Sequence, residues 1–115
     1  MENFLKAMLK AKPKIKTEYG LRIYNHIETN SSYKMSIQCS AHHYCTPRRT
    51  TDITKYETYE VAIMGENGFA YPSDLENFHR KEELDECYEG TVFGEVPKDL
   101  VEDLYNFLNG ITLIK

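Results

Sequence analysis

Apolar and polar side chains alternate through the middle of the chain, and this alternation constrains the fold more than any other feature. A period of two is typical of a β-strand with one buried face. In the first run, residues 21–27, Leu21, Ile23 and Ile27 are apolar, and Arg22, Tyr24 and His26 are expected on the opposite face. Met35, Ile37 and Cys39 form a second run after the turn-forming residues 30–32. The two runs predict an antiparallel hairpin.

A second hairpin is predicted farther along the chain. Tyr59, Val61 and Ile63 alternate with more polar neighbours, and the turn Gly65-Glu66-Asn67-Gly68 separates them from residues 69–71. Residues 91–96 have the composition of one more short strand. The central part of the chain, residues 17–96, is therefore expected to be mainly antiparallel sheet.

Helices are predicted at both ends of the chain. Residues 2–11 carry apolar side chains at helical spacing, and Pro13 makes continuation costly. Pro97 opens a clearer amphipathic stretch, Lys98 to Asn109, and Gly110 provides its stop. Residues 73–84 predict a short helix or an ordered loop. We expect an α+β fold: one domain over residues 1–115, with an antiparallel sheet of four or five strands and both terminal helices packed on it.

The formal net charge of −4 conceals two oppositely charged parts. Residues 1–49 contain nine lysines and arginines against three acidic residues, whereas residues 50–115 contain five against fifteen. This division predicts a basic patch able to hold an anion, and an acidic face that disfavours direct binding to nucleic acid. Two solvated surfaces are the alternative reading. The lysines between residues 10 and 16 predict an exposed basic connector or a partner-binding arm.

The location of the protein is predicted from two further patterns. No apolar stretch approaches the roughly 20 residues that span a bilayer, and the first residues lack the order of a secretion signal. The three cysteines, an odd number at irregular spacing, suit reduced thiols better than disulfides. These patterns predict a cytoplasmic protein that does not bind a membrane.

Thiols, imidazoles and guanidiniums are concentrated in residues 38–51. The candidate zinc ligands are Cys39, His42, His43 and Cys45, with Cys87 as a distant fourth position. Their spacing matches no common paired-ligand pattern, so no metal is assigned and the zinc question stays open. Cys45 lies beside basic groups that would favour a thiolate, but no base, orienting group or oxyanion site can be identified. We therefore assign no catalytic residue and no cofactor.

The same segment has the residue types that hold a small phosphorylated ligand. Guanidiniums form forked hydrogen bonds to phosphate, hydroxyls add further bonds, and phenol rings stack on bases. The predicted ligand-binding residues are Tyr44, Thr46, Arg48, Arg49, Thr50, Tyr56 and Arg22. In the alternative reading the arginines neutralise carboxylates such as Glu57 and Glu60, and the tyrosines only cover the sheet.

Three short motifs resemble a group of small, mostly uncharacterised bacteriophage proteins. They are Tyr44-Cys45-Thr46-Pro47-Arg48, residues 56–62 (YETYEVA) and residues 92–97 (VFGEVP), and the resemblance extends over roughly residues 33–110. It implies a non-enzymatic accessory protein that antagonises host antiviral defence, and it implies that the predicted cytoplasmic location is the cytoplasm of the host cell. The expected mechanism is a sponge that sequesters a nucleotide second messenger.

Two other functions are left open by this resemblance. In the first, the acidic part of the chain binds and inhibits a defence nuclease, in the manner of an anti-CRISPR protein. In the second, the protein has a structural or assembly role in the phage particle. The partner is accordingly a nucleotide-like small molecule or a host defence protein, and a homo-oligomer is compatible with either.

Overall fold

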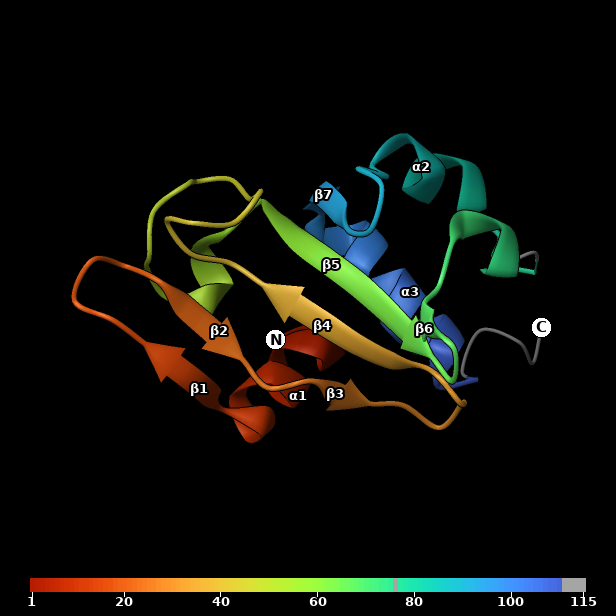
Figure 1. Ribbon diagram of the computed structural model, residues 1–115, viewed down its shortest axis with the longest axis horizontal. Coiled ribbons are helices and arrows are strands. Elements are labelled where there is room, and N and C mark those ends of the chain that lie inside the picture. Colours follow the sequence, from red (N-terminus) through yellow and green to blue (C-terminus); the bar gives the residue numbers. More distant parts are fainter. Residues whose placement is uncertain (76, 111–115) are drawn as a thin grey trace.

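The computed structural model describes residues 1–75 and 77–110 and has an α+β fold (Figure 1). Five strands form the main antiparallel sheet: β3 (Ile27–Glu28), β4 (Lys34–Gln38), β5 (Thr58–Gly65), β6 (Gly68–Phe69) and β7 (Phe93–Pro97). β4 pairs along one edge of β5, and β6 and β7 share the other edge. The predicted fold class is confirmed.

The register of the sheet confirms the alternation predicted for its two central strands. Met35 lies opposite Ile63, and Ile37 lies opposite Val61. Paired residues of antiparallel strands point to the same face, so these four buried side chains form one apolar surface. The β5–β6 hairpin is also confirmed, and Gly68, the first residue of β6 after the turn, has a φ of 104°, which favours glycine.

Helices α1 (Asn3–Ala11) and α3 (Lys98–Leu108) cover this apolar face, behind the sheet in Figure 1. α1 buries Phe4, Leu5 and Met8, and the Phe4 ring meets the Tyr59 ring edge-on at 5.2 Å. The carboxylate of Glu102 on α3 accepts hydrogen bonds from the backbone N–H groups of Asn3 and Phe4. This contact supplies the N-terminal acceptor that α1 lacks locally and fixes the two helices side by side.

The N-terminal lysine-rich segment is a strand instead of the predicted connector. β1 (Pro13–Lys16) pairs with β2 (Arg22–Tyr24) in a separate two-stranded sheet, and all four β1 residues are exposed. Of the predicted first strand, residues 21–27, only Ile27 pairs with β4, together with Glu28, which follows it. The run of residues 21–27 is therefore divided between two sheets at Asn25 and His26.

The predicted facing of the first run was wrong at Arg22 and Tyr24, which are buried, whereas Ile23 is half-buried. The side chain of Gln38 explains this orientation. Its amide oxygen accepts from Tyr24 N–H at 2.8 Å and its amide nitrogen donates to Tyr24 O at 3.0 Å. One side chain thus replaces a strand partner for β2 and places the β2 side chains against the main sheet.

A compact segment connects β6 to β7. It contains the 3₁₀ helix η2 (Pro72–Leu75) and the short helix α2 (Lys81–Glu86), which agrees with the predicted short helix or ordered loop; Glu76 lies outside the described residues. Arg80 joins this segment to α3 through ion pairs with Asp99 and Asp103 at 3.0 and 2.9 Å. None of the described helices is long and apolar enough to cross a membrane.

Candidate functional site

The chain between β4 and β5 carries six of the seven predicted ligand-binding residues, and the seventh, Arg22, lies in β2. We call residues 44–51 the arginine loop. Three segments that are distant in sequence meet at its start. Glu95 N–H donates to Tyr44 O at 2.9 Å, and Glu57 N–H donates to Thr46 O at 2.8 Å. The hydroxyls of Thr46 and Thr58 both donate to Glu95 Oε1, at 2.5 and 2.8 Å. The three motifs of the phage resemblance are therefore neighbours in space.

Tyr56 lies beneath the arginine loop instead of facing a ligand. Its buried hydroxyl donates to Arg49 O at 2.5 Å and accepts from Thr51 N–H at 3.0 Å. Thr50 has a similar structural role, because its hydroxyl donates to Gly20 O and accepts from Ala41 N–H. These contacts fix the backbone of residues 49–51 before any ligand arrives.

Arg22 supports the loop from within the protein. Its Nη2 donates to Cys39 O at 2.9 Å and to the Tyr56 hydroxyl at 3.4 Å. The guanidinium carbon lies 5.3 Å from the centre of the Tyr24 ring, and Nε is buried without a hydrogen-bond partner in the described part of the chain. Arg22 is only 8% exposed, so it places a positive charge under the loop without reaching its surface.

Tyr44, Arg48 and Arg49 are the predicted residues that face solvent, together with Thr46. The Arg48 guanidinium carbon lies 4.9 Å from the centre of the Tyr44 ring, which is a cation–π arrangement. The backbone N–H of Tyr44 donates to Glu60 Oε1 at 3.1 Å. The seven predicted residues are thus divided: Arg22, Tyr56 and Thr50 shape the loop, and the other four lie on its surface.

The arginines of the loop differ from Arg80 in their ion pairing. Arg80 forms ion pairs with Glu83, Asp99 and Asp103. Over residues 1–75 and 77–110, none of the ion pairs involves Arg22, Arg48 or Arg49. The alternative reading, in which these arginines pair with Glu57 and Glu60, is not what the described contacts show. Two of the three guanidiniums are consequently available to an external anion.

The cysteines and histidines of the segment have a structural arrangement. Burial raises the pKa of Cys39 to about 12 and also raises the pKa of Cys45, so both stay protonated thiols at neutral pH. His43 Nδ1 lies 2.7 Å from the Ser40 hydroxyl, and burial lowers the pKa of its imidazole. Among the described residues, no three histidine, cysteine, aspartate or glutamate side chains are grouped closely enough to hold a metal ion.

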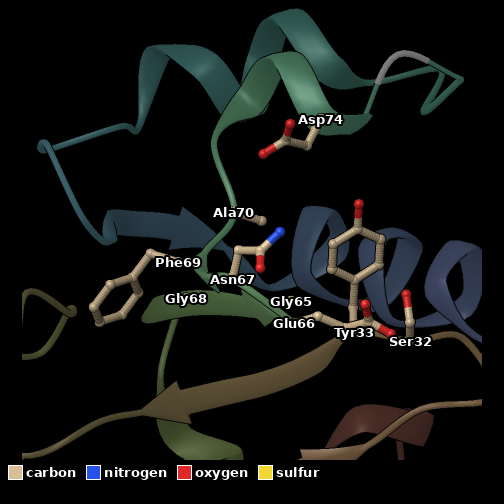
Figure 2. Close-up of a pocket in the computed structure, with 9 residues that line it drawn as sticks. All are labelled: Ser32, Tyr33, Gly65, Glu66, Asn67, Gly68, Phe69, Ala70 and Asp74. Carbon is tan, nitrogen blue, oxygen red and sulfur yellow. The ribbon is translucent and has the colours of Figure 1, made fainter.

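Surface hollows occur elsewhere on the molecule. One of about 310 Å³ lies between the turns at Tyr33 and Glu66 and η2, and Figure 2 shows the carboxylate of Asp74 and the ring of Tyr33 on opposite sides of it. Glu66 and Asp74 make its lining acidic, with no lysine or arginine among the described lining residues. Phosphate would meet like charge there, so this hollow is a poor site for a nucleotide.

A larger hollow, of about 490 Å³, lies between α1 and α3 and is lined in part by Lys6, Lys10 and Tyr105. Sequence reasoning missed these residues because they come from opposite ends of the chain. The only local signal was the pair of lysines four positions apart on a predicted helix, which place both on one side. The sequence did not show that this side would meet α3.

Comparison of the chain with models of known protein families gives no match, and comparisons with curated proteins and with solved structures also give none.

Proposed function

We propose that the protein is a non-enzymatic binding protein that holds a small phosphorylated ligand of the nucleotide type on its arginine loop. Sequestration of a nucleotide messenger of host antiviral defence would follow from such binding. The observation that carries the proposal is the exposed pair Arg48 and Arg49, neither of which has an ion pair with a described residue. A surface guanidinium without an ion pair can donate hydrogen bonds to a phosphate without first breaking an ion pair.

The geometry of the loop adds two properties that favour binding. Tyr56 and Thr50 fix the backbone through buried or half-buried hydrogen bonds, which reduces the ordering that a ligand must impose. Arg48 already lies over the Tyr44 ring, so a base could extend this stack on the outer face of the guanidinium. The two nearby carboxylates, Glu60 and Glu95, accept hydrogen bonds from the protein itself.

The test is a thermal-shift screen of the purified protein with linear and cyclic nucleotides and ADP-ribose derivatives. A ligand at 100 times its Kd stabilises the folded state by about 2.7 kcal/mol. In a chain of this size that raises Tm by roughly 10 °C. We expect one ligand to give such a shift, and we expect Arg48→Ala to abolish it.

Lys55→Ala is the matched control, because it removes the same charge from an exposed position in η1 (Ile53–Lys55), close to the loop in sequence. It should keep the ligand-induced shift. Tyr44→Leu should weaken the binding of nucleotides more than the binding of inorganic phosphate, since only nucleotides have a base that stacks on the Tyr44 ring. A shift that survives Arg48→Ala, or equal losses in Arg48→Ala and Lys55→Ala, would contradict the assigned site.

The acidic α2 segment favours a second candidate, an inhibitor that binds a basic protein surface. Glu82, Asp85 and Glu86 are exposed, and no described ion pair involves them, whereas Glu83 is paired with Arg80. Such a surface steers association with a basic nucleic-acid channel. If no nucleotide shifts Tm, a partner captured from host lysate should survive Arg48→Ala and be lost when these three carboxylates are replaced by lysine.

A further inference from the structure

The hollow between α1 and α3 is an open depression of the surface, formed by residues outside the arginine loop. Its volume of about 490 Å³ lies in the range of pockets that hold small molecules. Asn30, which precedes β4, lines it, whereas the arginine loop follows the end of β4. The described lining residues include none of residues 44–51, so the two places are separate.

The lining of the hollow is basic. Lys6 and Lys10 are one helical turn apart on α1, both are exposed, and neither has an ion pair with a described residue. No carboxylate is among the described lining residues. Glu102 lies next to Asn3, but both of its oxygens accept backbone N–H groups of α1, at 3.1 and 3.0 Å. An anion entering the hollow would meet two free ammonium groups.

The remaining lining supplies an aromatic ring and amides. Tyr105 is half-buried on α3, and its hydroxyl makes no hydrogen bond within the described part of the chain. Asn30 N–H donates to Asn109 Oδ1 at 3.0 Å, and Asn109 Nδ2 donates to Tyr105 O at 2.8 Å. These bonds brace the wall that carries the ring. The side-chain oxygens of Asn30 and Asn3 are not used as acceptors by any described donor, so they remain free to accept from a base.

We propose that this hollow is a binding site for a mononucleotide, in which Lys6 and Lys10 hold the phosphate and the Tyr105 ring stacks on the base. Two ammonium groups on adjacent helical turns suit one phosphate, and the ring on the facing helix lies within the same hollow. The site uses none of the residues of the arginine loop. Because AMP is itself a linear nucleotide, a thermal shift with AMP should survive Arg48→Ala and be lost in the double variant Lys6→Ala, Lys10→Ala, which separates this site from the function proposed above.

The experiment is a ¹⁵N–¹H NMR titration of the full chain with AMP and, separately, with ribose 5-phosphate. We expect saturable shifts at the amides of Lys6, Ala7, Tyr105 and Asn109. The double variant Lys6→Ala, Lys10→Ala should weaken both ligands by about tenfold or more, because it removes two charge-assisted contacts. Tyr105→Leu should lower the affinity for AMP by about fivefold and leave the affinity for ribose 5-phosphate unchanged, because only AMP has a base that stacks on the ring.

The matched control is the double variant Lys14→Ala, Lys16→Ala. It removes the same charge from exposed positions on β1, outside the hollow. Equal weakening in the two double variants would overturn the proposal, because it would show binding to general positive charge. Shifts confined to residues 44–51 would also overturn it and would leave the arginine loop as the site. The absence of saturable shifts at millimolar ligand would overturn it without bearing on the messenger screen.

Discussion

The hydroxyl of Tyr56 connects the surface of the arginine loop to the interior. It bonds Arg49 O and Thr51 N–H at the loop and accepts from the buried Arg22. Tyr56→Phe leaves these groups without their partner in a buried region. We expect a loss of about 1–3 kcal/mol in the free energy of unfolding, measured by urea titration.

The conservative control for this substitution is Tyr19→Phe. Tyr19 is 73% exposed, and its hydroxyl makes no hydrogen bond among the described residues, so its removal should change stability by less than about 0.5 kcal/mol. The proposed function adds a second readout: Tyr56→Phe should weaken nucleotide binding although Arg48 is intact. Unchanged stability in Tyr56→Phe would show that the loop is fixed by other contacts.

The local sequence of residues 38–51 predicted only part of the candidate site. Tyr44 and Arg48 could be linked from their spacing in a short segment, and the structure stacks them. The burial of Arg22 and Tyr56 could not be predicted, because it depends on where β2 lies relative to β4. That placement is set by the Gln38 side chain, whose role is a tertiary contact without a local signal.

At the scale of elements, periodicity was a good guide where one face of the element is buried. It predicted α3, the strands β4 and β5 and the β5–β6 hairpin, but not that β4 and β5 pair with each other. It failed for β1, because all four residues of this strand are exposed and its lysines resemble a solvated connector. A two-stranded ribbon held mainly by backbone bonds leaves no hydrophobic pattern to find.

A substitution of Arg80 tests whether its ion pairs stabilise the packing of the α2 segment against α3. Its side chain is only 19% exposed and forms ion pairs with Glu83, Asp99 and Asp103. Arg80→Met leaves three carboxylates close together without a cation. We expect the amide of Leu84 in α2 and that of Cys87, which follows α2, to exchange hydrogen faster, and the global stability to fall by roughly 1–2 kcal/mol at low salt.

The control for Arg80→Met is Lys81→Met, which removes the neighbouring cation without breaking a described ion pair. Exchange in β5 should be unchanged in both variants at conditions where the protein stays folded, because its amides bond within the sheet. Equal exchange of α2 in the wild type and Arg80→Met would show that Leu84 and Phe78, both buried, hold the segment without the ion pairs.

The whole molecule combines one apolar core with two separate regions of charge. The core extends from Phe4 to Leu108 and includes residues of the sheet, α1, α2 and α3. Exposed lysines lie on α1 and β1, and exposed carboxylates lie on α2. The lysines of α1 and β1 and the carboxylates of α2 thus lie on separate elements. Glu60 and Glu95 of the acidic half, however, contact the arginine loop, so the division of charge in the sequence is only partly kept in space.

The three cysteines allow the cooperativity of this core to be tested. Cys39 and Cys45 are 0% and 1% exposed and belong to the core, whereas Cys87 is half-buried at the end of α2. With iodoacetamide at pH 8, we expect Cys87 to be alkylated in the native protein. Cys39 and Cys45 should be protected because they are inaccessible. Burial raises the pKa of all three thiols, so it is exposure that distinguishes Cys87 from the other two.

In increasing urea, Cys39 and Cys45 should become reactive together, at the midpoint where far-UV circular dichroism is lost. Cys39 reports on the end of β4 and Cys45 on the arginine loop, so a common midpoint means that the loop unfolds with the sheet. Mass spectrometry of the alkylated peptides measures each site separately. If Cys45 reacted at lower urea than Cys39, the loop would open locally, and its hydrogen bonds to Tyr56 would not provide the preorganisation that the proposed ligand site requires.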